Sequence, residues 1–332
     1  MVLVTGGTGF LGSVLIKQLV DSGVDIRAIR RDSSAIPPSL LDHPRIQWVE
    51  ADITDFFALE EAFEGVTQVY HCAAFVSFDP RDRTRMLNIN VAGTAYVVTL
   101  ALERGARLVH VSSVAAVGDP KSGSESTEDD LWEYSPDRSA YSVSKYESEQ
   151  EVWRGIAEGL NAVIVNPSII IGRTARSGSN GSSGTLFTTI QKGLDFYTLG
   201  GVGLVDVEDV ARAMVLLMDN PAIRGERFLL NSANVSNREL LATCSEYLGR
   251  PVPRFRATPF MLGLAWRAAR WLSLFTGRPP VITKDIAKAA SKRRYFSNAK
   301  IRSATGMEFR PIDDTLREIC TTLQKNTDSN KI

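Results

Sequence analysis

Short runs of β-branched and aliphatic residues alternate with segments of helical spacing over the first half of this 332-residue chain. Each run is long enough for one buried strand, and each intervening segment repeats its apolar residues every three or four positions. The predicted strands are Val2 to Thr5, Asp25 to Arg30, Arg45 to Glu50, Gln68 to Cys72, Arg107 to Ser112 and Asn161 to Asn166. The predicted helices are Leu11 to Val20, Phe56 to Phe63, Met86 to Glu103 and Ala140 to Ile156. Strands that alternate with crossover helices form a doubly wound parallel sheet, so we predict an α/β fold.

Composition excludes several classes of partner. Lys and Arg together number 38, as do Asp and Glu, so the formal net charge is zero and gives no reason to expect nucleic acid or an acidic membrane surface as a partner. Three cysteines and three histidines at wide spacing predict neither a disulfide framework nor a metal site. The N-terminus does not read as a secretory signal, and we expect a cytoplasmic protein. The apolar stretch Thr258 to Phe275 contains two arginines, so we expect an amphipathic helix packed on the protein and no membrane span.

A glycine-rich turn follows the first predicted strand and opens the first predicted helix. It reads GxxGxxG, with Gly6 permitting a tight turn, Gly9 letting the backbone approach a pyrophosphate, and Gly12 letting the helix pack closely on the sheet. The free N–H groups and the dipole of the helix N-terminus favour phosphate. The turn therefore predicts a bound dinucleotide, and its contacts are assigned to Thr5, Gly6, Gly9, Phe10, Leu11 and Gly12.

The end of the second predicted strand bears on the choice of dinucleotide. An acidic residue there would bind both ribose hydroxyls and repel a 2′-phosphate. This chain has Arg30 and Arg31, whose guanidinium groups suit a phosphate. We therefore favour NADP(H), while the adjacent Asp32 keeps NAD(H) possible.

Tyr141 and Lys145 stand four residues apart in a predicted helix and so share one face. A phenol with a pKa of about 10 exchanges protons poorly near neutral pH, and a neighbouring ammonium group lowers that pKa. Ser112 and Ser113 end the preceding strand and can place a hydroxyl beside Tyr141. The three residue types together suggest an acid–base site.

In order and spacing these motifs resemble the short-chain dehydrogenase/reductase superfamily over nearly the whole chain, and in length its extended branch. The resemblance rests on TGGTGFLG (Thr5 to Gly12), Asp52-Ile53, His71-Cys72-Ala73-Ala74, Asn90 to Thr94, VSSVAAVG (Val111 to Gly118), YSVSK and Asn166-Pro167-Ser168. The segments RAIRRD and NPSIIIG are most similar to dihydroflavonol-reductase-like members, which reduce ketones or aldehydes with NADPH. The NAD-dependent epimerases form a second similar branch.

The resemblance implies a role for each matching residue. Tyr141 would be the general acid/base, Lys145 would lower its pKa and hold the nicotinamide ribose, and Ser113 would hydrogen-bond the reacting oxygen. Further cofactor contacts would come from Asp52 and Ile53 at the adenine, Ala73 and Ala74 beside the ribose, Asn90, Asn166, and Ser168 near the carboxamide. Arg173 departs from the proline that many relatives carry there.

After Asn166 the pattern changes. The Gly/Ser-rich stretch Arg173 to Gly184 follows a strand end, where open α/β sheets bind ligands, and we interpret it as a lid over the site in preference to an inert linker. The last hundred residues are mostly helical in pattern, with one extended piece near Pro251 to Phe255. We expect a Rossmann domain of residues 1–166 and about 203–233, and a substrate-binding domain of residues 167–202 and 234–332.

Three functions compete. The first is an NADPH-dependent reductase of a small ketone or aldehyde, which would run the reverse reaction on an alcohol. The second is a nucleotide-sugar epimerase or dehydratase, but Val202 and Gly203 stand where such relatives usually carry an Arg-Asp pair, although Arg173, Arg176 or Lys192 could supply charge. The third is a non-catalytic cofactor sensor or scaffold. In relatives the two long helices pair across a two-fold axis, so a homodimer is expected.

Several other side chains receive simpler interpretations. His71 and Cys72 are expected to be packing residues. Glu147, Glu149 and Glu151 are assigned to a solvated helix face, and Trp266, Trp271 and Phe275 to core or dimer contacts. An aromatic substrate pocket is expected from Phe75, Phe78, Phe187, Phe196 and Tyr197.

Overall fold

A seven-stranded parallel sheet forms the centre of the larger part of the molecule in the computed structural model, which describes residues 1–120, 125–136, 138–173, 182–276 and 283–329. Its strands are β1 (Val2–Thr5), β2 (Ile26–Arg30), β3 (Ile46–Glu50), β4 (Gln68–His71), β5 (Arg107–Val111), β6 (Ala162–Pro167) and β10 (Glu226–Leu230). They lie in the order β3-β2-β1-β4-β5-β6-β10, and every pair is parallel. The order reverses between β1 and β4, which is the switch point where doubly wound sheets bind ligands. The predicted α/β class is confirmed.

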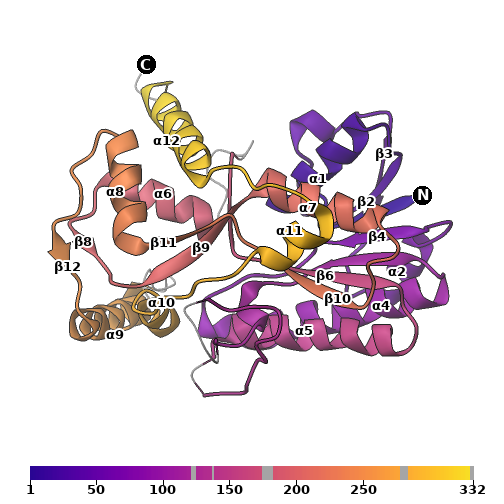
Figure 1. Ribbon diagram of the computed structural model, residues 1–332, viewed down its shortest axis with the longest axis horizontal. Helices are drawn as coiled ribbons and strands as arrows, with labels where there is room; N and C mark the ends of the chain where they lie inside the picture. The colour runs from indigo at the N-terminus through magenta and orange to yellow at the C-terminus, as the bar shows by residue number, and fades with distance from the viewer. Residues whose placement is uncertain (121–124, 137, 174–181, 277–282, 330–332) are drawn as a thin grey trace.

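Helices cover both faces of this sheet (Figure 1). On one face lie α1 (Phe10–Asp21), α7 (Val207–Asp219) and α11 (Ala299–Thr305). On the other face lie α2 (Phe56–Ala62), α3 (Arg83–Leu87), a π-helical turn (Asn88–Ala92), α4 (Gly93–Glu103) and α5 (Ala140–Ala157). Together with the sheet they make up what we call the large lobe.

The central strands are buried on both faces, as a covered parallel sheet requires. All five residues of β5 are buried, and successive side chains point to opposite sides. Leu108 packs with α2, α4 and α5, whereas Val109 packs with α1 and α7. This double burial explains why the strand sequences read as continuous aliphatic runs.

The remaining elements form a small lobe with its own apolar core. A three-stranded sheet of β11 (Ala233–Ser236), β9 (Gly201–Asp206) and β7 (Ile169–Ile171) packs with α6 (Ser182–Lys192), α8 (Asn237–Tyr247) and α12 (Ile312–Ser329). A second sheet pairs β8 (Phe196–Tyr197) with β12 (Phe255–Arg256), and α9 (Pro259–Thr276) and α10 (Lys284–Ala289) complete the lobe. The lobe is helix-rich as expected, and the extended piece predicted near Pro251 to Phe255 ends in β12. The other strands of its small sheets were not predicted, because strands of two to six residues with several glycines show too little periodicity.

One stretch of the described residues is long and apolar enough to cross a membrane by length and composition. It is Arg83–Glu103, which comprises α3, the π-helical turn and α4. Its side chains include Val97, Val98 and Leu100, all fully buried against the sheet. The stretch therefore packs as a core helix of the large lobe.

Candidate active site

The glycine-rich turn has the geometry that an anion-binding loop needs. Gly6 has a φ of +69°, which a side chain would strain, and its carbonyl accepts a hydrogen bond from the Gly9 amide at 2.9 Å. A Cβ at Gly12 would collide with the Gly6 carbonyl, so only glycine lets α1 start this close to the turn. Gly9 is the N-cap of α1 and offers no side-chain cap, and the first turn contains no acidic residue. The N-terminus of α1 is therefore open to a negatively charged group.

His71 supports the glycine-rich turn through hydrogen bonds. The Thr5 hydroxyl accepts a hydrogen bond from the Ala73 amide at 3.2 Å and lies 2.7 Å from His71 Nδ1. His71 Nε2 lies 3.1 Å from Thr94 Oγ1, so the neutral ring bridges the two hydroxyls, with one ring nitrogen donating and the other accepting. Burial, together with the charge of Lys145, lowers the pKa of His71 to about 3 and keeps the ring neutral. His71 thus links β1, β4 and α4 through hydrogen bonds, which is a larger role than the packing predicted for it.

A cavity of about 190 Å³ lies at the carboxyl ends of β1, β2, β3 and β4. It brings together eight of the cofactor contacts that the sequence predicts, namely Gly6, Gly9, Arg30, Arg31, Asp52, Ile53, Ala73 and Ala74. Phe10, Leu11 and Gly12 follow directly as the first turn of α1, and Leu11 and Gly12 are buried there. The cavity also includes Thr8 and Ser34, which sequence reasoning did not assign, and Phe75, which it assigned to the substrate pocket.

The two arginines at the end of β2 are not equivalent. Arg30 lies 3.4 Å from the Glu50 carboxylate on the neighbouring strand β3. Arg31 has no ion-pair partner in the part of the chain that the structure describes. Arg31 is therefore the cation that is free to meet an anion in the cavity. Asp52 is engaged locally, because its Oδ1 accepts from the amide and hydroxyl of Thr54 at 2.9 and 2.7 Å.

Ser113 and Tyr141 come together at the end of β5 and the start of α5. Ser139 caps α5 by accepting from the Ser142 amide, and this places Tyr141 in the first turn of the helix. The Ser113 hydroxyl is within hydrogen-bonding reach of the Tyr141 phenol, and the Phe78 ring lies 5.8 Å from the tyrosine ring. Burial raises the pKa of Tyr141, and the bond from Ser113 opposes that rise. The phenol is therefore protonated at neutral pH.

Lys145 is buried one helical turn after Tyr141, and its Nζ donates to the Val111 carbonyl at 3.0 Å. Burial lowers the pKa of Lys145 to about 8, against the opposing charges of Cys72 and Glu149. The sequence analysis expected Lys145 to lower the pKa of Tyr141. The structure differs, because burial dominates the phenol and the ammonium group is directed to the end of β5.

Glu149 lies on the same face of α5 and is buried, whereas the sequence analysis placed it on a solvated face. Its Oε2 accepts from the Ser112 hydroxyl at 2.6 Å and from Asn166 Nδ2 at 2.7 Å. Its Oε1 lies 3.3 Å from Arg227 of β10. The spacing Tyr141, Lys145, Glu149 is i, i+4, i+8, and this one-sided pattern was the signal that could have identified the residue.

Two asparagines support the site from neighbouring elements. Asn90, in the π-helical turn, accepts from the Phe75 amide at 2.7 Å and donates to the Phe75 carbonyl at 2.9 Å. Asn166 donates to the Ser113 carbonyl at 3.0 Å. Asn166 Oδ1 and the Ser168 hydroxyl are buried and have no hydrogen-bond partner among the described residues. Such atoms are costly unless a bound group satisfies them.

The expected aromatic pocket is only partly assembled. Phe78 lies against Tyr141, and Phe75 lines the cavity. Phe187 is instead buried in the core of the small lobe, and Phe196 packs on Phe255 at 5.7 Å between the short strands. The latter two are therefore structural. Much of the predicted lid, residues 174–181, lies outside the described part of the chain.

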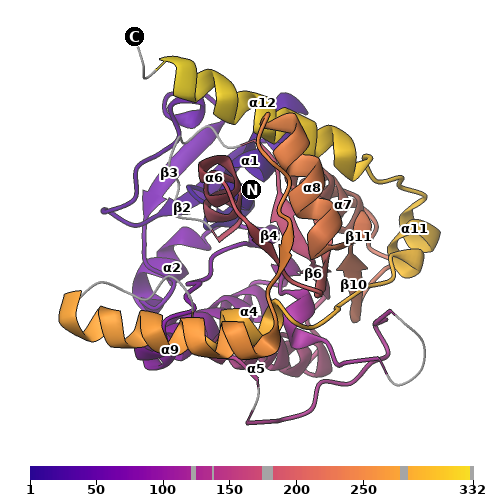
Figure 2. The same cartoon turned by 90° about the vertical axis from the view of Figure 1, so that its left-hand side faces the viewer.

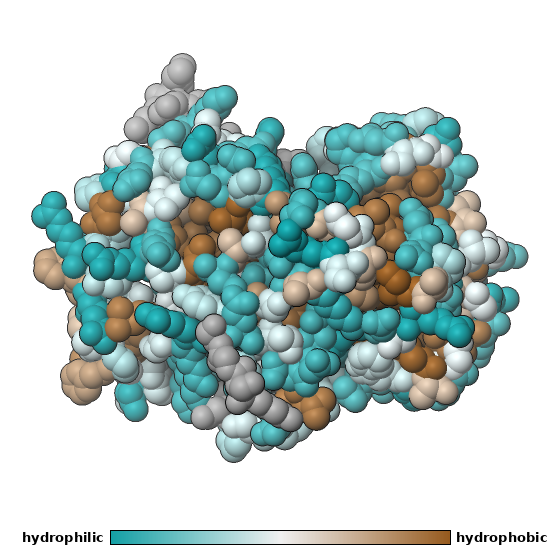
Figure 3. Space-filling model, in the orientation of Figure 1, coloured by the Kyte–Doolittle hydropathy of each residue, from teal (hydrophilic) through white to brown (hydrophobic). Residues whose placement is uncertain are grey.

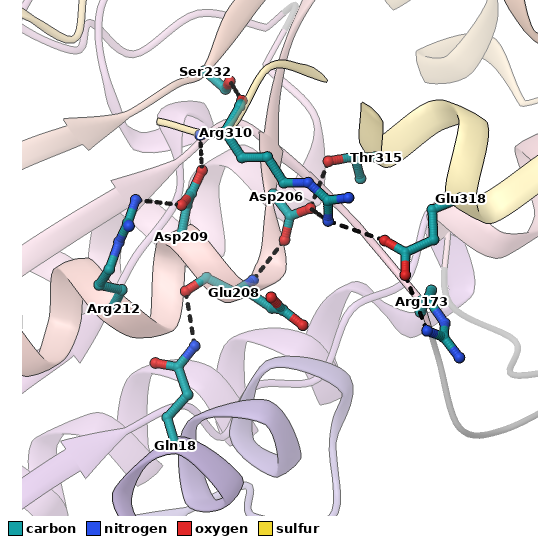
Figure 4. A network of polar contacts seen from close by, with 10 residues as sticks. All are labelled: Gln18, Arg173, Asp206, Glu208, Asp209, Arg212, Ser232, Arg310, Thr315 and Glu318. Carbon is teal, nitrogen blue, oxygen red and sulfur yellow. Dashed lines mark hydrogen bonds and ion pairs between the residues drawn. The ribbon is translucent and has the colours of Figure 1, made fainter. Parts of the chain in front are cut away.

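A charged network joins the C-terminal segment to the end of β9 and to α7 (Figure 4). Asp206 accepts from Thr315 Oγ1 at 2.5 Å and lies 3.5 Å from Arg310. Glu318 of α12 then pairs with both Arg310 and Arg173, each at 3.0 Å. Arg173, which the sequence left as a possible substrate cation, is therefore committed to α12.

The family model described as "NAD dependent epimerase/dehydratase family" matches residues 2–230, which include the glycine-rich turn, Ser113, Tyr141 and Lys145. The chain belongs to this family. It is similar to a putative dihydroflavonol 4-reductase of Synechocystis sp., with 32% identity over 325 residues, covering 95% of this chain and 92% of the relative. It is also similar to cinnamoyl-CoA reductase 1 of Petunia hybrida, with 28% identity covering 98% of this chain and 92% of that one.

The solved crystal structure of gox2253 has the same fold, with a TM-score of 0.83, 28% identity and 98% coverage of each chain. The predicted membership of the extended short-chain dehydrogenase/reductase superfamily is thus confirmed, and so is the prediction of an NAD(P)-dependent oxidoreductase.

Proposed function

We propose that this member of the family is an NADPH-dependent reductase of a ketone or aldehyde, with Tyr141 as the proton donor. The observation that carries the proposal is the pairing of the buried Ser113 with the half-buried Tyr141, in which a protonated phenol stands beside a second hydroxyl. A carbonyl oxygen placed between the two hydroxyls would be polarised by Ser113 and protonated by Tyr141. The reductase names of the similar chains agree with this direction of reaction.

The described residues fit a nicotinamide dinucleotide. The open N-terminus of α1 suits the pyrophosphate, and the cavity between β2 and β3 suits the adenosine half. The unsatisfied atoms of Asn166 and Ser168 suit the donor and acceptor of the carboxamide. When bound, the reduced nicotinamide supplies a hydride to the substrate carbon.

The chain itself moves and holds the proton. Tyr141 donates its phenolic proton to the substrate oxygen as negative charge develops there, and Ser113 donates a hydrogen bond to the same atom. Lys145 offers an ammonium group one turn away, which would hold a ribose hydroxyl of the cofactor. Glu149 holds Ser112, and Asn166 holds the Ser113 carbonyl, so the end of β5 is fixed from both sides.

NADPH is favoured over NADH because Arg31 borders the adenosine end of the cavity without an ion-pair partner among the described residues. A ribose 2′-phosphate at that position would form a charge-assisted hydrogen bond with its guanidinium. Arg30 would contribute less, since Glu50 already shares its charge.

The nucleotide-sugar alternative finds little support at the positions where such relatives carry a basic clamp. Gly203 has no room for a side chain, because a Cβ there would collide with Asn231, and Val202 packs into the core of the small lobe. Arg173 is paired with Glu318. A sugar diphosphate would therefore meet an already neutralised arginine there.

Two accompanying proposals concern assembly and location. The outer sides of α4 and α5 are only partly buried, and a homodimer that pairs these helices across a two-fold axis remains our prediction, to be checked by light scattering. We also propose a cytoplasmic location.

A substrate screen tests the function. NADPH oxidation is followed with ketones, aldehydes, acyl thioesters and nucleotide sugars, in parallel with NADH. Turnover of a ketone or aldehyde with NADPH supports the proposal. Turnover of a nucleotide sugar without net NADPH consumption would establish the epimerase class. Tight NADPH binding with no turnover of any carbonyl would favour the sensor.

A further inference from the structure

Helix α9 presents large apolar side chains to solvent. Phe260, Leu264, Trp271 and Phe275 are exposed by 81, 63, 64 and 81%, respectively. Their spacing of four, seven and four residues puts them on a single stripe of the helix. The sequence analysis expected this helix to pack on the protein, and Trp271 and Phe275 to be core or dimer contacts. The structure differs, because none of the described side chains of α9 is fully buried.

The helix lies at the outer end of the small lobe. Figure 1 shows it beside α10, and Figures 1 and 2 both show it apart from α8 and α12, which close the apolar core of that lobe. Figure 3 shows a mostly hydrophilic face with apolar residues in separate groups, one of them at the left-hand end over β12 and α9. The stripe is therefore a surface feature and not a part of the core.

The net charge of the whole chain is zero, but the basic and acidic residues are unevenly distributed along the sequence. Of the 38 basic and 38 acidic residues, residues 247–307 contain thirteen Lys or Arg and a single acid, Asp285. The rest of the chain therefore holds 25 basic and 37 acidic residues. The part of the sequence that contains α9 and α10 is strongly positive, and the remainder is negative by the same amount.

Basic side chains lie next to the apolar stripe. Arg267 borders it, with its guanidinium 4.7 Å from the centre of the Trp266 ring, and Arg270 lies further round the helix. Arg254 and Arg256 precede the helix around β12. Within the described ranges, Arg254, Arg256 and Arg270 are all exposed and make no ion pair. Their charges are thus available to an external partner.

We propose that α9 is an interfacial helix that binds this protein to the surface of an anionic lipid bilayer. An aromatic and aliphatic stripe flanked by arginines is the pattern of helices that lie in the plane of the headgroups, and 18 residues give a helix about 27 Å long. The apolar stripe enters the headgroup region, and the arginines meet the lipid phosphates. The negative remainder of the chain is repelled by the same surface, so the bilayer would also orient the molecule.

A second copy of the chain fits the stripe less well than a bilayer. A two-fold contact of stripe on stripe would place two positively charged segments against each other, and like charges across an interface oppose binding. The anionic cytoplasmic face of a membrane has the complementary charge.

Flotation with lipid vesicles tests the proposal without reference to catalysis. The full chain is mixed with vesicles of phosphatidylcholine alone, or of phosphatidylcholine with phosphatidylserine, at low and high salt. The wild type is expected to float with the anionic vesicles at low salt and to be released by salt. Trp271→Ala/Phe275→Ala and Arg267→Glu/Arg270→Glu are each expected to weaken binding about tenfold or more. All four side chains are exposed, so the fold should survive.

Matched control variants distinguish binding through α9 from nonspecific adsorption to lipid. Phe57→Ser removes an exposed aromatic residue from α2, and Arg83→Glu/Arg224→Glu makes the same charge change in the large lobe. Both should float like the wild type. Brominated lipid should quench tryptophan emission in the wild type and much less in Trp271→Phe.

Three results would overturn the proposal. The wild type could fail to float with anionic vesicles, or the α9 variants could float as well as the wild type. Alternatively, sedimentation could show that the wild type self-associates and that the α9 variants do not, which would assign the stripe to a second copy. None of these results depends on whether the protein reduces a carbonyl.

Discussion

The Ser112 hydroxyl donates to the Glu149 carboxylate at 2.6 Å, so two residues from different elements lock the end of β5 to the middle of α5. Ser113, the next residue, faces Tyr141 instead. Ser112 therefore anchors the strand, and Ser113 contacts the reacting group.

Glu149→Gln is expected to change both stability and the pH dependence of turnover. It removes a buried carboxylate that accepts hydrogen bonds from Ser112 and Asn166, and bonds to charged groups contribute about 1.5–3 kcal/mol each. Its negative charge also supports the ammonium form of Lys145, so the pKa of Lys145 should fall in the variant. Denaturant unfolding and the alkaline limb of kcat/KM measure the two effects. Glu147→Gln is the matched control, and an alkaline limb that does not move in Glu149→Gln would contradict the coupling.

Helices α5 and α9 show how much of the structure can be predicted from the sequence. The motif set predicted the sheet and the glycine-rich turn, and it placed Ser113 at a strand end and Tyr141 and Lys145 on one helix face, because strand ends and helix faces follow from spacing alone. Glu149 was misassigned because charge is a poor guide to burial when partners come from distant strands. The apolar stripe of α9 could be recognised from the regular spacing of its residues in the sequence. Such spacing shows only which residues share a face of the helix, and not what that face contacts.

The pKa of Lys145 predicts the alkaline behaviour of the free enzyme. Burial lowers this pKa to about 8, so the ammonium form is present below that pH and is lost above it. If the charge assists the reaction, kcat/KM for carbonyl reduction falls as the pH rises through about 8, while the raised pKa of Tyr141 keeps the phenol protonated there. Lys145→Arg, which keeps its charge, should show a lower but flat profile over the same range. A wild-type profile that stays flat to pH about 10 would exclude this role.

Arg31 is expected to matter more than Arg30 for cofactor choice. Arg31→Ala should weaken NADPH binding about tenfold or more, since it removes a charge-assisted bond, and should leave NADH binding nearly unchanged. Arg30→Ala should have a smaller effect because Glu50 shares its charge. Fluorescence titration with both cofactors at two salt concentrations measures this. Equal affinities of the wild type for NADPH and NADH would refute the preference.

The buried histidines predict sensitivity to acid. His110 lies 5.2 Å from His71 in ring centroid distance, and burial lowers the pKa of both well below the ordinary value. In the described part of the chain neither ring nitrogen of His110 has a hydrogen-bond partner. Because the unfolded chain binds protons below pH about 6.5 and the folded chain does not, the free energy of unfolding decreases as the pH falls.

His110→Leu tests this account. The substitution should reduce the acid slope of the unfolding free energy by about 1.4 kcal/mol per pH unit below pH about 6. His43→Leu, which removes a histidine from a partly exposed position, is the matched control. Urea unfolding at several pH values gives the slopes, and an unchanged slope in His110→Leu would show that this ring is protonated in the folded state.

The central claim is that Tyr141 donates the proton in an NADPH-dependent carbonyl reduction, and a single-turnover measurement on Tyr141→Phe tests it most directly. The variant, saturated with NADPH, is mixed with the carbonyl compound that the screen identifies, and NADPH oxidation is followed in time. The account predicts a rate about 10² to 10⁴ times slower than that of the wild type, with NADPH affinity preserved because the ring is retained. A variant that is folded, saturated with cofactor and as fast as the wild type would contradict it.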